Sequence, residues 1–248
     1  MKKMIALLSA AVMAVAATAQ MRAYAVSTEL AAIPVTNRTV TARDTSGYIA
    51  EVVRLVNQER SKRGLGELKM FPRLSRAAAI RADEITVSMG HARPDGSGIT
   101  ALFSQLGIKW SSIGENLAKG QTTPEMVVNG WMNSEDHRDS ILKPEYKYIG
   151  VGVAESDGKL HWAQLFIDTT VAHPEAISAK DSGDVNGDSK VNAVDASLVL
   201  ADYAATGSGK PSTFSAVQRT KADVNGDEAV NAVDASQILS VYAKNSTR

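Results

Sequence analysis

The stretch DVNGDSKVNAVDAS occupies residues 184–197, and it returns as DVNGDEAVNAVDAS at residues 223–236. The two copies begin 39 residues apart and differ only at their sixth and seventh positions. Because a repeated sequence unit indicates a repeated structural unit, this pair is the natural starting point for the fold. The regularity favours two equivalent loops over a linker.

Each copy carries oxygen-bearing side chains at positions 1, 3, 5, 9 and 12, and position 7 would add a backbone carbonyl. Calcium is a hard cation that takes six to eight oxygen ligands, and an EF-hand-type loop supplies them at this spacing. The sequence therefore predicts two calcium ions, one for each loop. The expected ligands are Asp184, Asn186, Asp188, Lys190, Asn192 and Asp195, and then Asp223, Asn225, Asp227, Ala229, Asn231 and Asp234.

Two positions depart from the usual EF-hand pattern. Position 12 is aspartate, which is shorter than the usual glutamate, and position 6 is Ser189 or Glu228 where glycine is usual. A residue with a side chain in a left-handed backbone is strained by about 1–3 kcal/mol. We therefore expect a positive φ at Ser189 and Glu228 and a reduced affinity for calcium. The alternative is a solvated Asn- and Asp-rich turn repeated by chance, which does not account for two complete ligand sets.

An apolar segment follows each loop, and the two segments correspond in position. They contain Leu198, Val199, Leu200 and Tyr203 in the first copy and Ile238, Leu239, Val241 and Tyr242 in the second. With these segments, residues 183–248 resemble a type I dockerin. The resemblance implies a small all-α calcium-binding domain of two EF-hand-like loop-helix repeats, and as its partner the cohesin domain of a scaffold protein.

The same resemblance places partner choice at loop positions 10 and 11. These are Ala193, Val194, Ala232 and Val233. The near-identity of the copies favours a dockerin in which either repeat can face the cohesin.

The composition excludes several classes of protein. The 248 residues contain 27 basic and 27 acidic side chains, so no net charge favours binding to nucleic acid or to a membrane surface. The chain has no cysteine, and this excludes a disulfide framework and thiolate chemistry. The length fits one ordinary domain and a small one.

Residues 1–25 have the pattern of an export signal. Lys2 and Lys3 precede a short apolar run, and two A-x-A cleavage motifs follow, at residues 17–19 and 23–25. A membrane span needs about 20 apolar residues, so a cleaved signal is favoured over an uncleaved anchor. We expect a secreted, scaffold- or cell-surface-associated protein with no membrane segment after cleavage. Residues 26–45 form a polar lead-in.

The pattern of residues 46–170 predicts a layered domain. Apolar spacing predicts helices at residues 44–63 and from Pro72 to Met89, with Arg81 and Glu84 on the exposed face of the second. A short helix at residues 99–106 and one that begins at Thr123 follow, and two strands lie at 146–154 and 160–168. Helices before and between short strands indicate an α/β or α+β domain. Residues 171–182 have the composition of a linker, with His173 in it.

Four segments of this domain could carry chemistry: MGHARPDG (89–96), IGENLAKG (113–120), WMNSEDHRDSIL (131–142) and HWAQLF (161–166). Histidine and glutamate can hold a metal or transfer protons near neutral pH. Structural roles remain open for three of the candidates. Glu115 could accept backbone N–H bonds, His137 could make a structural hydrogen bond on a polar turn, and His161 could be packed with a satisfied ring. His91 has no evident packing role.

In this order the four segments resemble the CAP, or SCP-like, superfamily in its bacterial branch, over about residues 49–167. The resemblance implies an α–β–α sandwich, an α+β fold, with a central cleft that can hold a divalent metal such as zinc. It assigns His91, Glu115 and His161 to the cleft. The family's second glutamate corresponds to Ser134 here, and His137 is the residue that the bacterial branch carries in this motif.

Together these features predict a cellulosome-type component. Its dockerin would bind a cohesin in a calcium-dependent way, and its CAP domain would act as a binding or accessory module on extracellular polysaccharide or cell wall. The alternative is a hydrolase acting on cell-wall glycan or peptide, with Glu115 as general base and His91 and His161 holding a metal or polarising the substrate.

Overall fold

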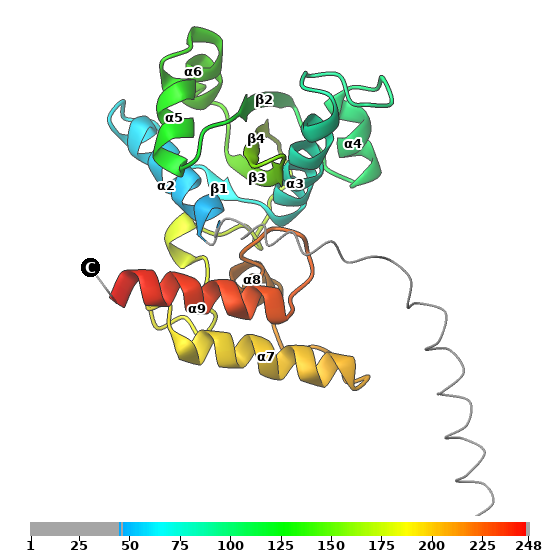
Figure 1. Ribbon diagram of the computed structural model, residues 1–248, viewed down its shortest axis with the longest axis vertical. Helices are drawn as coiled ribbons and strands as arrows, with labels where there is room; N and C mark the ends of the chain where they lie inside the picture. Colours follow the sequence, from blue (N-terminus) through cyan, green and yellow to red (C-terminus); the bar gives the residue numbers. More distant parts are fainter. Residues whose placement is uncertain (1–44, 46, 247–248) are drawn as a thin grey trace, which may run out of the picture. The chain divides into compact units, whose positions relative to one another are not determined.

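A four-stranded sheet forms the centre of the first domain in the computed structural model, which describes residues 45 and 47–246 (Figure 1). The predicted export signal and nearly all of the predicted lead-in lie outside these residues. The strand order is β1-β3-β4-β2; β3 is antiparallel to β4 and β4 to β2, whereas β1 is parallel to β3. The strands are β1 (Lys69–Met70), β2 (Ser112–Lys119), β3 (Tyr148–Ser156) and β4 (Lys159–Asp168).

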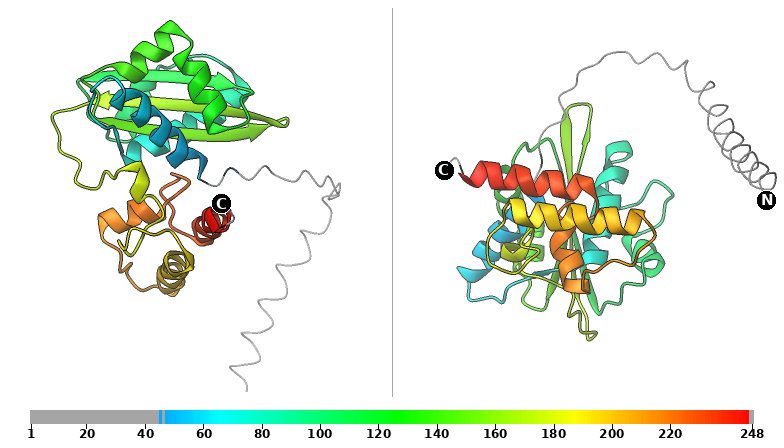
Figure 2. Two further views of the ribbon diagram at one scale, coloured as in Figure 1. Left: turned by 90° about the vertical axis from the view of Figure 1, so that its left-hand side faces the viewer. Right: turned by 90° about the horizontal axis from the view of Figure 1, so that it is seen from below.

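Helices cover both faces of this sheet, which confirms the predicted α–β–α sandwich (Figures 1 and 2). One face packs against α2 (Tyr48–Ser61), α5 (Pro124–Met132) and α6 (Glu135–Leu142). The other face packs against α3 (Pro72–Val87) and α4 (Ile99–Gln105). The apolar stripe predicted for the first helix is its buried face, made of Ile49, Val52, Val53 and Val56.

Helix α3 lies unusually close to β3. Side chains alternate between the faces of a strand, so Gly150 and Gly152 both face the helix. A Cβ at Gly150 would lie 2.2 Å from the Leu74 carbonyl oxygen, and one at Gly152 would lie 2.2 Å from that of Ala78. These two strand positions leave room for backbone only, and they fix the height of α3 above the sheet.

The sequence analysis did not predict strand β2 or helix α6. The segment IGENLAKG forms most of strand β2, and its Glu115 pairs with Leu165 of β4. His137 was expected on a polar turn, but it lies in helix α6. Buried Arg60 helps to hold the end of α6, because its guanidinium donates to the carbonyls of Ile141 and Lys143 at 2.8 Å each.

The segment expected to be a linker packs on the first domain. Met70 and Ile177 exchange two backbone hydrogen bonds, of 2.8 and 3.1 Å, and Ile177 is buried. His173 stacks on Phe71 with ring centroids 3.9 Å apart. Composition did not reveal this packing because the segment's few apolar side chains make contacts that are distant in sequence.

The second domain is all-α, as predicted. It contains α7 (Ala193–Gly207), α8 (Ala216–Ala222) and α9 (Ala232–Ser246), whereas the one-turn helix η1 (Ala179–Asp181) precedes it and packs on the first domain. Helices α7 and α9 follow the two loops and lie side by side around a core that includes Val199, Ala235 and Ile238 (Figure 2). Helix α8, which precedes the second loop, was not predicted.

Replacing Gly150 or Gly152 by alanine should destabilise the first domain strongly. The added methyl group would overlap the backbone of α3, and overpacking of a core costs about 1–3 kcal/mol and occasionally more. We expect each variant to lower the free energy of unfolding by about 3 kcal/mol, measured by denaturant titration. Gly66→Ala is the control, because a Cβ there would meet nothing within 4 Å. Wild-type stability in Gly150→Ala would contradict the close packing.

Candidate ligand site and calcium loops

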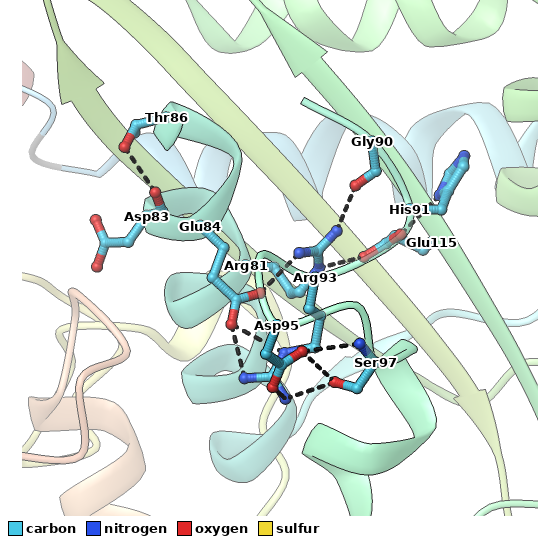
Figure 3. Close-up of polar contacts among 10 residues, drawn as sticks. All are labelled: Arg81, Asp83, Glu84, Thr86, Gly90, His91, Arg93, Asp95, Ser97 and Glu115. Atoms are coloured by element: carbon cyan, nitrogen blue, oxygen red, sulfur yellow. Dashed lines mark hydrogen bonds and ion pairs between the residues drawn. The ribbon is translucent and has the colours of Figure 1, made fainter. Parts of the chain in front are cut away.

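A buried carboxylate and an exposed imidazole meet at the edge strand β2. Glu115 Oε2 lies 2.7 Å from His91 Nδ1, and Glu115 Oε1 accepts a hydrogen bond from Arg81 Nε at 2.8 Å (Figure 3). The side chain of Glu115 is 6% exposed and that of His91 is 71% exposed. The carboxylate therefore orients the imidazole from below, and the rest of the ring is open to a ligand.

Arg81 organises this pair. Its side chain is fully buried, and it donates to Glu84 at 2.7 Å and to the Gly90 carbonyl at 2.7 Å besides Glu115 (Figure 3). Burial alone would lower the pKa of Arg81, but the hydrogen bonds to Glu115 and Glu84 raise it above its ordinary value. The charged guanidinium therefore compensates the buried carboxylate of Glu115 and the partly buried one of Glu84. Without this charge, burying the carboxylates would be costly.

The sequence analysis placed Arg81 on the exposed face of its helix, and this was wrong. The residue continues the buried spacing of Leu74, Ala77, Ala78 and Ile85, with which it shares a face. The helical period of 3.6 residues places Arg81 among the core positions. This was the signal that could have shown its burial. A buried arginine needs carboxylate partners, which here are Glu84 and Glu115.

The rest of MGHARPDG builds the loop that presents His91. Arg93 donates to Glu84 at 2.7 and 2.9 Å, and Asp95 accepts from the backbone and hydroxyl of Ser97 (Figure 3). Burial would raise the pKa of Glu84, but hydrogen bonds from Arg93 and Arg81 hold it below its ordinary value. These contacts are structural, and the imidazole of His91 extends from the loop into solvent with its side chain 71% exposed.

His137 lies on the other side of β2 from Glu115. Its Nδ1 is 2.8 Å from Ser134 Oγ, and its carbonyl accepts from Asn116 Nδ2 at 3.0 Å. Asn116 follows Glu115 in the strand and so points to the opposite face. His137 thus makes the structural hydrogen bond that was one of its two expected roles, and it does not meet His91.

His161 is buried on the same face as Glu115 but farther along the sheet. It pairs with Lys119, whereas Glu115 pairs with Leu165, so the two positions are four residues apart along β4, or about 13 Å. The side chain is 1% exposed, and neither ring nitrogen has a hydrogen-bond partner of standard geometry. The structure does not bring His161 to the His91–Glu115 pair.

This arrangement does not fit a zinc site. Among residues 45 and 47–246, no third His, Cys, Asp or Glu side chain joins His91 and Glu115 to form a group that could hold a metal ion. His91 and Glu115 supply at most two ligands, and Arg81 already occupies one oxygen of Glu115. The pair is better suited to hydrogen bonding with a ligand.

The two acidic loops carry oxygen donors that fit calcium in kind. The φ angles are 67° at Ser189 and 66° at Glu228, which confirms the expected left-handed backbone at position 6. In the first loop Asp195 accepts from three backbone amides, those of Val185, Asn186 and Asn192. The side-chain amide of Asn186 donates to Asp188 Oδ2 at 3.0 Å, so two of the expected ligand side chains lie together.

Two carboxylates of the second loop lie in surroundings that disfavour their ionised form, which a bound cation would stabilise. Burial and the nearby charge of Asp234 raise the pKa of Asp223 to about 7. Burial likewise raises the pKa of Asp234 to about 6. A bound divalent cation reverses such shifts because it favours the ionised form. Asp223, Asp234 and their neighbours are therefore the residues that would hold calcium in this loop.

The stability of the first domain should fall as the pH drops below about 6.5. Burial, and secondarily Lys119, lower the pKa of His161, so near that pH the unfolded chain takes up a proton that the folded chain excludes. The slope can reach about 1.4 kcal/mol per pH unit, and His161→Gln should reduce it between pH 6.5 and 5. All three tryptophans lie in this domain, so their fluorescence in denaturant titrations measures it. Equal slopes in both proteins would contradict this effect.

Two family models match the chain. Residues 53–166 match the cysteine-rich secretory protein family, CAP, and residues 182–240 match the type I dockerin domain. The uncharacterized protein YkwD of Bacillus subtilis is 42% identical over 135 residues, which cover 53% of this chain and 52% of YkwD. The uncharacterized membrane protein YlbC of the same bacterium is 26% identical over 47% of this chain and 33% of YlbC. The chain thus spans about half or less of these relatives.

Solved structures with CAP or SCP domains are similar to the first domain. An extracellular SCP-domain protein of Bacillus anthracis has 23% identity and a TM-score of 0.47, over 50% of this chain and 41% of its own. An outer surface protein of Borrelia burgdorferi has 21% identity and a TM-score of 0.48, over 52% of this chain and 97% of its own. In residues 45 and 47–246, no helix is both long and apolar enough to cross a bilayer. The chain thus carries a CAP domain followed by a type I dockerin domain.

Proposed function

We propose that the protein is a secreted component of a scaffold-borne extracellular complex. Its dockerin binds a scaffold cohesin in the presence of calcium, and its CAP domain acts as a binding or accessory module on polysaccharide or cell wall. A dockerin domain implies a cohesin partner in general. The calcium dependence and the ligand of the CAP domain are the parts that need experiments.

The observation that carries the cohesin part is a pair of matching apolar surfaces on α7 and α9. Val194 is 55% exposed and Val233, its counterpart 39 residues on, is 52% exposed. The other matched pairs are Leu200 at 44% with Leu239 at 42%, and Tyr203 at 47% with Tyr242 at 42%. Large apolar side chains gathered on a surface favour a protein partner. Their equivalence supports binding through either repeat.

The CAP part rests on the exposed His91. Its orientation is fixed by a buried carboxylate, and Met89 and Val87 beside it in the chain are 49% and 80% exposed. A fixed polar group beside apolar surface is the usual composition of a recognition site. A glycan or peptide ligand could hydrogen-bond His91 and pack against the apolar side chains.

The hydrolase alternative has one observation in its favour, the orientation of His91 by Glu115. An imidazole held by a carboxylate can accept a proton from a nucleophile. The general-base role first assigned to Glu115 is less favourable, because Arg81 and His91 engage both of its oxygens. In a hydrolase His91 would be the base and Glu115 its positioning residue, whereas the binding module needs no proton transfer.

Aspartate at both dockerin valines should abolish cohesin binding. We expect Val194→Asp or Val233→Asp alone to weaken binding to an immobilised type I cohesin about twofold, because the other repeat still binds. The double variant should lose at least a hundredfold, as expected for charge in the centre of an interface. Calcium chelation should have the same effect. Val87→Asp is the control, because Val87 is a still more exposed valine, at 80%, on the CAP domain. Binding by the double variant, or calcium-independent binding, would refute the assignment.

The role of the CAP domain can be measured by incubating the full chain with plant cell walls, bacterial peptidoglycan or denatured protein. We expect it to sediment with one polymer without releasing soluble products. His91→Gln and Glu115→Gln should lower the bound fraction about tenfold, the effect of one good hydrogen bond. Glu145→Gln changes an exposed glutamate elsewhere and should bind normally. Product release that His91→Gln abolishes would make the domain a hydrolase instead.

A further inference from the structure

The two calcium-type loops have nearly the same sequence but different surroundings. They differ only at positions 6 and 7, which are Ser189 and Lys190 in the first copy and Glu228 and Ala229 in the second. One of these differing residues, Glu228, contacts the CAP domain. Its Oε2 lies 2.6 Å from the Arg76 guanidinium at the start of α3. The second copy thus makes an ion pair with the CAP domain through one of the two residues that differ between the copies.

Backbone packing at position 4 distinguishes the loops further. Both position-4 glycines have a left-handed backbone, with φ 79° at Gly187 and φ 76° at Gly226. A Cβ at Gly226 would lie 3.1 Å from Ser75 Cβ and 4.0 Å from Ile49 Cδ1, both side chains being buried. A Cβ at Gly187 would meet nothing within 4 Å. The tip of the second loop therefore rests on α3 and α2, whereas the tip of the first is open.

The packing is the larger part of this contact. Arg76 and Glu228 remain 44% and 32% exposed, and ion pairs in such positions contribute little. The glycine contact excludes solvent from Ser75 and Ile49 and restricts positions 4 to 6 of the loop. These positions lie between the ligand residues Asn225 and Asp227 and the turn at Glu228, so docking holds part of the ligand set in place.

The contact leaves the proposed cohesin surface free. Val233, Leu239 and Tyr242 of the second repeat are as exposed as their counterparts in the first. Helix α9 does approach the CAP domain through Val241, since a Cβ at Gly47 would lie 3.1 Å from its Cγ2. The second repeat can therefore contact the CAP domain and a cohesin through different sides.

We propose that the second loop is a calcium-dependent docking element for the CAP domain. Calcium bound in this loop fixes the geometry that rests on Ser75 and Ile49, and so stabilises the start of α3. Calcium in the first loop has no such effect. By linkage, docking must in turn tighten calcium binding in the second loop. This inference rests on the calcium binding proposed above, and adds a coupling between that ion and the CAP domain.

The test compares two substitutions at equivalent glycines in the full chain. Asparagine tolerates a left-handed backbone, so Gly226→Asn and Gly187→Asn impose similar local strain. Only the first places a side chain against Ser75. Hydrogen–deuterium exchange with and without calcium would be followed at the amides of the first two turns of α3. A terbium luminescence titration measures ion binding independently.

In the wild type we expect calcium to slow exchange at the start of α3 at least fivefold. Gly187→Asn should keep this effect, and Gly226→Asn should lose it and bind the second ion about tenfold more weakly. Arg76→Ala, which leaves both loops intact, should reduce the effect partially. Should Gly226→Asn bind no second ion, Ser75→Leu places the obstruction on α3 instead and should remove the effect with both ions still bound.

Two results would overturn the coupling while leaving the proposed function intact. In the first, the wild type binds two ions without any change in hydrogen exchange at the start of α3. In the second, the calcium-dependent slowing of exchange persists in both Gly226→Asn and Ser75→Leu. If neither loop takes up terbium, calcium binding itself fails and the proposed function fails with it.

Discussion

Helix α3 can lie directly on the sheet only because the two strand positions beneath it, Gly150 and Gly152, have no side chains. Much of the rest of the molecule depends on this contact. Interiors are densely packed, so a helix held against backbone has little freedom to shift. The helix therefore acts as a rigid support whose two ends carry different parts of the molecule.

The last turns of α3 hold the candidate ligand site, and the first turn meets the second loop. Arg81 reaches Glu115 and the Gly90 carbonyl from the upper part of the helix, and thereby sets the position of His91. Ser75 and Arg76 lie about one and a half turns earlier and touch Gly226 and Glu228. A change in the height of α3 above β3 would move both sites at once. The position of His91 is thus a property of the core as much as of its own loop.

The parts that the sequence could predict are those built from local patterns. The left-handed backbone at Ser189 and Glu228 and the helices after the loops follow from spacing within one repeat. Periodicity indicated a layered α/β or α+β domain, and the α–β–α arrangement came from the family resemblance. The sequence could not show which histidines meet, because this depends on strand register. Glu115 lies opposite Leu165, which is four residues along β4 from His161. The alternation of side chains along β2 places His137 on the opposite side of the strand from Glu115. The glycine and polar residues of β2 concealed this strand in the sequence.

Identical ligand sets do not imply equal affinity for an ion. Both loops place a residue with a side chain in the left-handed region at position 6, at a cost of about 1–3 kcal/mol that calcium binding must offset. In the first loop nothing outside the loop compensates at that tip. In the second, packing of Gly226 on the CAP domain and the Arg76–Glu228 pair act on the same turn. The same sequence difference that makes position 6 glutamate rather than serine thus makes the strained residue a contact residue of the CAP domain.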